Sequence, residues 1–175
     1  MNATSTLAVL DRLAAFELSI CLRLRLLKSR RIRAVFVGVS RAGDGWLWLA
    51  LALVLPAVAG EPGWATTLEM ARVAGVCLPT YKLLKRTTAR PRPSAAASEL
   101  DALTVPLDTY SFPSGHTLHA VAFTMVAAGH FPDLLWILGP FTALVALSRL
   151  FLSLHYPSDV AAGACLGAAI VWLVP

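Results

Sequence analysis

Long apolar runs alternate with short polar segments along most of this 175-residue chain. Five runs carry few charged residues, and each approaches the roughly 20 residues that a helix needs to cross a bilayer. Peptide groups inside a bilayer must form hydrogen bonds within their own segment, so we expect all five runs to be helices. The runs cover residues 46–59, 68–84, 117–131, 134–154 and 160–175.

The first 43 residues follow a different pattern. Apolar residues in the range 4–27 recur at steps of three and four, as on one face of a helix, but five charged residues interrupt them. We expect an amphipathic helix at the membrane interface, with a weak sixth span as the alternative. Residues 28–41 carry five more basic residues and should lie near headgroups, and "RAGDGW" should form a turn into the first strong span. The pattern predicts an interfacial segment, residues 1–43, followed by a membrane-embedded core, residues 44–175.

The composition agrees with a membrane protein. Apolar residues make up 57% of the chain and charged residues only 14%, whereas a soluble domain carries about 25% charged residues. A soluble enzyme is therefore excluded, and the predicted fold is an all-α, multi-pass transmembrane helical bundle. The net charge of +5 favours anionic membrane lipids as partners. Nucleic acid is not an expected partner, because no basic stripe is interleaved with aromatic residues.

Three polar stretches lie at the ends of the runs, and simple alternation of the spans places all three on one face of the membrane. The first is "KRTTARPRP", which contains Lys85 and Arg92. A cation cluster at this position can bind phosphate, although by itself it is more typical of a basic headgroup anchor.

The second polar stretch is "SFPSGHTLHA", which leads into the third apolar run. Ser114 is a typical N-cap residue, Gly115 lets the backbone approach a ligand closely, and the free N–H groups of a helix start bind anions. His116 would then lie in the first turn, beside the bound group. By itself, the stretch is equally well explained by a capped helix with an incidental histidine.

The third polar stretch is "SRLFLSLHYPSD". Arg149 offers a planar fork that suits phosphate oxygens. Pro157 ends the helical pattern, so Asp159 falls in the first turn of the next helix and can reach back to His155. A carboxylate on one imidazole nitrogen fixes the tautomer and leaves the other nitrogen free to attack, although such pairs also occur in purely structural roles.

Together, the three patterns resemble the signature of the type 2 phosphatidic acid phosphatase and vanadium haloperoxidase superfamily. The order and spacing match at Lys85 with Arg92-Pro93, at Pro113-Ser114-Gly115-His116, and at Ser148-Arg149 with His155 and Asp159.

This resemblance implies an all-helical bundle with a phosphate site at one membrane surface. It implies that His155 is the nucleophile and forms a phosphohistidine, that Asp159 orients it, and that His116 is the general acid. The residues that correspond to the phosphate cradle are Lys85, Arg92, Ser114, Gly115 and Arg149.

The function implied by the resemblance is an integral membrane lipid phosphatase that hydrolyses a phosphomonoester or a diphosphate on a lipid. No metal or other cofactor is expected, because basic side chains and a helix start supply the positive charge and no carboxylate cluster suits Mg²⁺. Candidate substrates are undecaprenyl diphosphate, phosphatidylglycerol phosphate, phosphatidic acid and lipid A, and no residue decides between them. The small size of the chain is typical of a bacterial member, so we expect the protein in the cytoplasmic membrane of a bacterium.

Two other functions fit parts of the pattern. A vanadate-dependent haloperoxidase shares the motifs, but known members of that branch are soluble and much larger. A non-catalytic membrane protein that binds anionic lipid headgroups would not need both histidines and the aspartate. The orientation is a separate question, because the family expectation places the site outside the cytoplasm while the excess of basic residues on the same face favours the cytoplasm. We expect the outward orientation.

Overall fold

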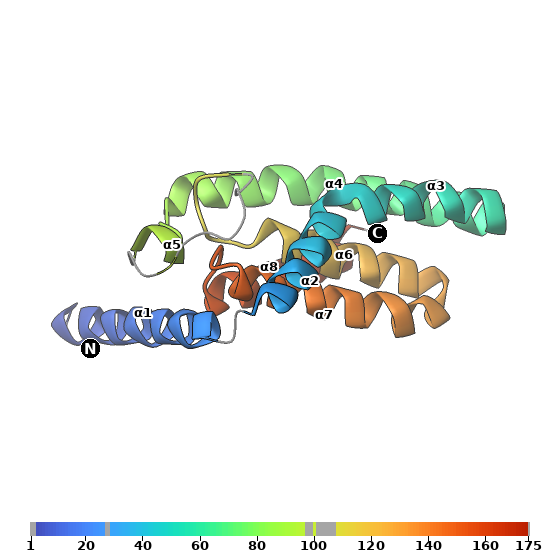
Figure 1. Ribbon diagram of the computed structural model, residues 1–175. Helices are drawn as coiled ribbons and strands as arrows, with labels where there is room; N and C mark the ends of the chain where they lie inside the picture. The colour runs from blue at the N-terminus through green and yellow to red at the C-terminus, as the bar shows by residue number, and fades with distance from the viewer. Residues whose placement is uncertain (1–2, 27–28, 97–99, 101–107, 175) are drawn as a thin grey trace.

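The computed structural model describes residues 3–26, 29–96, 100 and 108–174. All regular secondary structure in this part of the chain is helical (Figure 1). The longer helices are α1 (Ala3–Leu26), α2 (Arg30–Arg41), α3 (Leu47–Ala59), α4 (Glu61–Thr88), α6 (Gly115–His130), α7 (Leu135–Phe151) and α8 (Pro157–Leu173), and the short elements are η1 (Ala42–Trp46), α5 (Pro93–Ala96) and η2 (Pro132–Leu134).

The all-α prediction is confirmed, because each of the five apolar runs and the periodic N-terminal segment forms a helix. Among the described residues, two helical segments have the length and hydropathy of a membrane span, Arg30–Ala59 with 30 residues and Pro132–Phe151 with 20 residues. Helix α8 is apolar but shorter. The number of five spans and the interfacial position of α1 stay predictions.

The chain bends at "RAGDGW", where the sequence predicts a turn (Figure 1). Helices α2 and α3 meet there in a kink within η1, and Gly45, with a φ of 123°, departs from helical geometry. Glycine tolerates this backbone conformation because it has no Cβ atom. The predicted boundary between residues 43 and 44 falls inside η1 and stays a prediction.

Helix α6 lies at the centre of the bundle and packs against α4, α7 and α8 (Figure 1). Its contact with α8 is close, because Gly163 and Gly167 face the α6 backbone. A Cβ atom at Gly163 would lie 2.5 Å from the carbonyl oxygen of Ser114, and one at Gly167 would lie 2.4 Å from that of Leu118. Glycines four residues apart allow this kind of approach between membrane helices. The start of α6 is thereby held against the first turns of α8.

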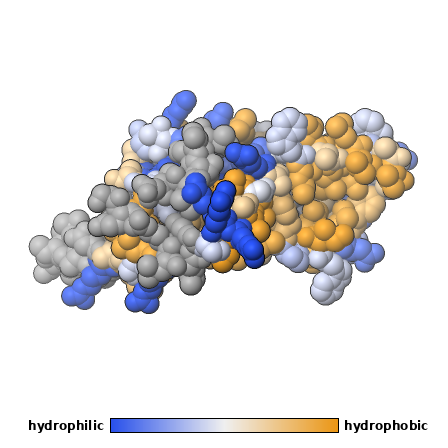
Figure 2. Space-filling model, in the orientation of Figure 1, coloured by the Kyte–Doolittle hydropathy of each residue, from blue (hydrophilic) through white to orange (hydrophobic). Residues whose placement is uncertain are grey.

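The molecular surface divides into an apolar and a charged part. In Figure 2, apolar side chains cover the half of the molecule formed by α3, the adjoining part of α4 and the α6–α7 hairpin, and charged side chains gather nearer α1. Large apolar side chains in this region are well exposed, among them Val58 at 81% and Trp136 at 82%. A surface of this kind suits contact with lipid tails rather than water.

Candidate active site

A cavity of about 530 Å³ opens where the ends of α4, α6 and α7 meet the segment before α8. The side chains that line it include the aromatic residues Trp48, Tyr81 and Phe123 and several basic residues. The predicted site residues that line the cavity are Lys85, Arg92, Gly115, His116, Arg149 and His155. Three segments far apart in the sequence therefore supply one pocket, as the alternation of spans predicts.

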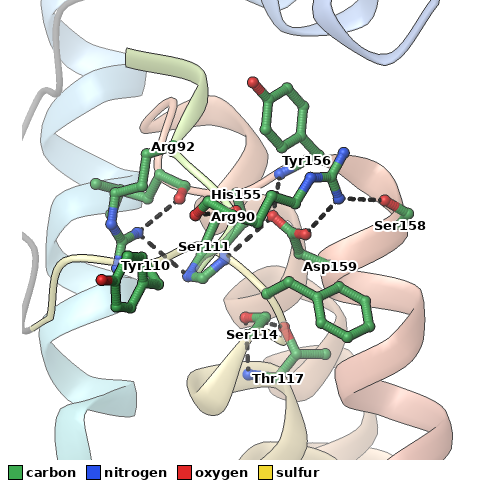
Figure 3. A network of polar contacts seen from close by, with 12 residues as sticks. Arg90, Arg92, Tyr110, Ser111, Ser114, Thr117, His155, Tyr156, Ser158 and Asp159 are labelled. Carbon is green, nitrogen blue, oxygen red and sulfur yellow. Dashed lines mark hydrogen bonds and ion pairs between the residues drawn. The ribbon is translucent and has the colours of Figure 1, made fainter. Parts of the chain in front are cut away.

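His155 lies in the segment between α7 and α8 and is 1% exposed. Its Nδ1 atom is 3.6 Å from Oδ2 of Asp159, and its Nε2 atom is 3.5 Å from Nη1 of Arg92. Figure 3 shows Arg92 and Asp159 on opposite sides of the imidazole ring. The Nδ1 contact is longer than a hydrogen bond, so the carboxylate faces this nitrogen without a direct bond, and Nε2 faces the arginine.

Asp159 is completely buried behind His155. Its Oδ2 atom accepts a hydrogen bond of 2.8 Å from the backbone N–H of Tyr156, which closes the first turn of α8. Its Oδ1 atom accepts one of 2.6 Å from Arg90. Two donors on two oxygens hold the carboxylate in the orientation that faces His155 (Figure 3).

The surroundings of His155 keep its imidazole neutral. Burial, followed by the positive charges of Arg149, Arg92 and Lys85, holds the pKa of His155 well below its usual value of 6.5. A neutral imidazole has a free lone pair on one nitrogen. The residue therefore has the protonation state that a nucleophile requires.

Lys85 and Arg92 share a partner that the sequence patterns did not indicate. The carboxylate of Asp108 accepts hydrogen bonds from Lys85 Nζ at 2.9 Å and from Arg92 Nη2 at 2.6 Å. Arg92 also donates to the carbonyl oxygens of Asp108 and Leu154. Asp108 is thus an anionic group that binds both cations in this part of the cavity.

Arg149 lies on α7 and is 3% exposed. Its Nη1 atom donates to the hydroxyl oxygen of Ser40 on α2, and its Nε atom is buried without a hydrogen-bond partner among the described residues. A buried guanidinium with an unused donor suits an anionic ligand. Ser40 is a second residue that the sequence patterns did not indicate.

The start of α6 has the predicted cap. Ser114 is completely buried, and its hydroxyl accepts a hydrogen bond from the backbone N–H of Thr117. Ser114 does not line the cavity, whereas Gly115 and His116 do. The side chain of Ser114 therefore caps helix α6, and the first turn of α6 lines the cavity through Gly115 and His116.

His116 has a carboxylate partner from another helix. Its Nε2 atom contacts Oδ1 of Asp44, which lies in the π-helical element η1. The only sequence signal for this partner was the position of Asp44 in "SRAGDGW", directly before the first strong span. His119, which sequence reasoning left out of the site, also lines the cavity, and its Nδ1 atom lies 2.8 Å from the carbonyl oxygen of Gly115.

No group of three or more His, Cys, Asp or Glu side chains within the described ranges is arranged to hold a metal ion. The chemistry that the side chains themselves offer is a neutral histidine with a carboxylate behind it, a second histidine with its own carboxylate, and several cations around one space. This combination suits transfer of a phosphoryl group.

A family model described as "PAP2 superfamily" matches residues 64–175, the range that contains all three polar stretches. The chain belongs to the PAP2 superfamily. Its relatives include a decaprenylphosphoryl-5-phosphoribose phosphatase of Mycobacterium tuberculosis, which is 38% identical over 76% of this chain and 73% of the relative. They also include an undecaprenyl-diphosphatase of Sulfolobus acidocaldarius, which is 29% identical over 81% of this chain and 68% of the relative.

The fold of this chain is also found in a solved structure of a PAP2 protein. The chain is similar to the crystal structure of a transmembrane PAP2 type phosphatidylglycerolphosphate phosphatase from Bacillus subtilis, with a TM-score of 0.75 and 24% identity over 94% of this chain and 85% of the other. The superfamily, the shared fold and the two apolar span segments make this chain a membrane phosphatase of the PAP2 superfamily.

Proposed function

We propose that this chain hydrolyses a phosphomonoester or a diphosphate carried on a membrane lipid, through a phosphohistidine at His155 and without a metal ion. The observation that carries the proposal is the position of His155, with Asp159 at one ring nitrogen and Arg92 at the other. A carboxylate at Nδ1 favours the tautomer in which Nε2 holds the lone pair. A cation beside Nε2 attracts the phosphate that this lone pair attacks.

The reaction has two steps. In the first, Nε2 of His155 forms a bond to the terminal phosphorus, and the bond from this phosphorus to the leaving oxygen breaks. The leaving oxygen is the lipid oxygen in a phosphomonoester and the bridging oxygen in a diphosphate, and His116 gives its proton to it. In the second, His116 takes a proton from water, the water oxygen bonds to phosphorus, and the bond from nitrogen to phosphorus breaks. Inorganic phosphate and free His155 result. Asp44 holds the ring of His116 at the edge of the cavity.

The phosphoryl oxygens are stabilised by fixed positive charge. Lys85, Arg92 and Arg149 surround the space beside His155, and the first turn of α6 at Gly115 adds free backbone N–H groups. Charge placed before the reaction is the main contribution that a protein makes to phosphoryl transfer. Ser114 contributes through the cap that fixes this turn.

We propose a polyprenyl-linked phosphate as the substrate class. The relatives from Mycobacterium tuberculosis and Sulfolobus acidocaldarius act on polyprenyl compounds by name. The aromatic side chains that line the cavity, Trp48, Tyr81 and Phe123, give the lipid part of such a substrate an apolar surface in the same cavity as the cations. Phosphatidylglycerol phosphate and phosphatidic acid are the alternative substrates with which turnover of polyprenyl compounds should be compared.

We further propose five membrane spans in the cytoplasmic membrane of a bacterium, with the active site facing the periplasm or the exterior and α1 outside the bilayer core. Single cysteines at positions 98 and 132, in a chain without its native cysteines, test the orientation. An impermeant thiol reagent applied to intact cells should label position 98 and leave position 132 unlabelled. The opposite pattern would place the active site in the cytoplasm.

Purified protein in detergent, assayed for phosphate release on a panel of lipid phosphates, tests the proposed function. The panel contains polyprenyl diphosphates, polyprenyl phosphates that carry a phosphorylated sugar, phosphatidylglycerol phosphate and phosphatidic acid. We expect release from a polyprenyl compound that persists in EDTA, is inhibited by vanadate and is lost in His155→Ala. Release that EDTA abolishes and Mg²⁺ restores would contradict the metal-free mechanism, and no release from any lipid would contradict the function.

A further inference from the structure

Arg90 connects the helix that bears Asp159 to the N-terminal helix. Its Nη1 atom donates to Oδ1 of Asp159 at 2.6 Å and to the hydroxyl of Ser158 at 2.7 Å, and its Nη2 atom donates to Oε2 of Glu17 at 2.7 Å. Its guanidinium lies over the ring of Tyr156, 4.1 Å from the ring centre. Figure 3 shows Arg90 on the side of Asp159 that faces away from His155. Arg90 does not line the cavity, so it is placed to act on Asp159 and not on a substrate.

Glu17 lies on α1 and is 9% exposed. Its Oε1 atom accepts a hydrogen bond of 2.7 Å from the backbone N–H of Ser158, at the start of α8, while its Oε2 atom binds Arg90. A carboxylate at a helix N-terminus satisfies a free N–H group and interacts favourably with the helix dipole. Glu17 therefore fixes both Arg90 and the turn that carries Asp159.

Apolar contacts hold α1 in this position. Cys21 is completely buried and belongs to one cluster with Tyr156, and Leu18 and Leu22 of α1 pack against that cluster. Tyr156 is also the residue whose backbone N–H binds Asp159. The contact between α1 and the catalytic segment is thus both polar and apolar.

We propose that Glu17 and Arg90 are positioning residues for the His155–Asp159 pair, so that α1 is a working part of the active site and not only a membrane anchor. This inference rests on the proposed phosphatase function. Glu17 orients Arg90, Arg90 holds Oδ1 of Asp159, and Asp159 faces Nδ1 of His155.

The physical reason is the burial of Asp159. A buried carboxylate that loses a charged partner is strongly destabilised in its ionised form. It then takes up a proton or turns toward another donor, and in either case it no longer holds the imidazole tautomer. Without Glu17, Arg90 keeps its bonds to Asp159 and Ser158 but loses the partner that fixes its second nitrogen. The change should therefore affect turnover and leave the phosphate cradle, which lies on the other side of His155, unchanged.

The test compares Glu17→Gln with Glu69→Gln in the full-length protein. Glu69 is a matched control, because it also joins two helices, through His130 at 2.7 Å, and that pair lines a separate cavity away from the site. With an aryl phosphate as substrate, we expect Glu17→Gln to lower kcat about tenfold, as neighbouring charged residues couple by this order of magnitude. KM should stay within about twofold of the wild-type value, because phosphate binding is unchanged. Glu69→Gln should behave as the wild type.

A double mutant separates positioning from general loss of structure. If Glu17 acts through Asp159, adding Glu17→Gln to Asp159→Asn should cost no further activity, whereas independent effects would multiply. Arg90→Lys is the second variant if Glu17→Gln does not fold. A lysine keeps the charge but cannot bind Asp159 and Glu17 with a planar fork, so kcat should again fall without a change in KM.

The outcomes separate this inference from the proposed function. Wild-type protein that releases no phosphate from any substrate would overturn the function. Active wild type, inactive His155→Ala and a Glu17→Gln variant equal to Glu69→Gln would overturn the positioning role alone. Multiplicative losses in the double mutant, or a rise in KM without a fall in kcat, would also overturn it.

Discussion

The backbone N–H of Ser114 donates a hydrogen bond of 3.0 Å to the carbonyl oxygen of Asp159. This bond joins the residue before α6 to the first turn of α8, and so joins two of the three polar stretches directly. It forms because Gly163, one turn further along α8, leaves room for the carbonyl oxygen of Ser114. The position of His116 relative to His155 therefore depends on how closely these two helices pack.

Gly163→Ala should weaken that packing. Its Cβ atom would lie 2.5 Å from the carbonyl oxygen of Ser114, so the helices must separate, at a cost of about 1–3 kcal/mol in the free energy of unfolding. Gly75→Ala is the matched control, because a Cβ atom there meets nothing within 4 Å. We expect a lower melting temperature and a lower turnover for Gly163→Ala only. Equal melting temperatures for the two variants would contradict the close approach.

Asp108→Asn should strengthen inhibition by vanadate. Burial acts to raise the pKa of Asp108, but the hydrogen bonds and charges of Lys85 and Arg92 outweigh it and hold the pKa below its usual value of 3.8. The group is therefore ionised at neutral pH and competes with an anionic ligand for the two cations. Its removal should lower the inhibition constant about fivefold, as expected for a partly exposed charge pair. Asp133→Asn, at an exposed position in η2, is the control. Weaker inhibition in Asp108→Asn would mean that Asp108 instead builds the cradle.

His116→Ala should affect substrates according to their leaving groups. General acid catalysis contributes about 10²–10⁴-fold, and a lipid alkoxide needs the proton more than a phenolate does. Turnover should therefore fall much further on a lipid phosphate than on an aryl phosphate. Asp44→Asn should also lower turnover more on the lipid phosphate than on the aryl phosphate, but by a smaller factor, because it weakens the contact that holds His116. Equal losses on both substrates would assign His116 to the phosphate cradle.

The stability of the protein should depend on pH through His155. Burial and nearby cations keep its pKa in the folded state well below 6.5. Below about pH 6.5 the unfolded chain takes up a proton at this residue and the folded chain does not, so the free energy of unfolding should fall as the pH falls. Above about pH 6.5 the imidazole is neutral in both states, so the stability that depends on the neutral imidazole of His155 is fully present. Melting temperatures in detergent at about pH 7.5 and about pH 5.5 should differ more for the wild type than for His155→Gln. An equal difference would contradict the burial of a neutral imidazole.

The sequence predicted the helices and most of the cavity because both follow from local patterns. Hydropathy located the five apolar helices, and the alternation of spans brought Lys85, His116 and His155 to one end of the bundle. The cap at Ser114 followed from the chemistry of one residue. Hydropathy could not indicate the geometry of the bend between α2 and α3, because the kink at Gly45 leaves no distinct pattern of apolar residues.

The partners of the site residues were not predictable in the same way. Asp44 contacts His116, Ser40 contacts Arg149, and Glu17 binds Arg90, and each pair joins segments far apart in the chain. Such pairs depend on the angles between helices, which local periodicity does not contain. Glu17 was one of five charged residues in the range 4–27, and the sequence pattern did not distinguish it from the other four.

The most direct test of His155 as the nucleophile is a rapid-quench experiment. Purified protein is mixed with a lipid substrate labelled in the phosphate that is released, and the reaction is stopped in alkali, in which a phosphohistidine survives. We expect label on the peptide that contains His155 in the wild type and none in His155→Ala, which should also lose turnover on lipid and aryl phosphates alike. Label on any other residue, or near wild-type turnover in His155→Ala, would contradict the mechanism.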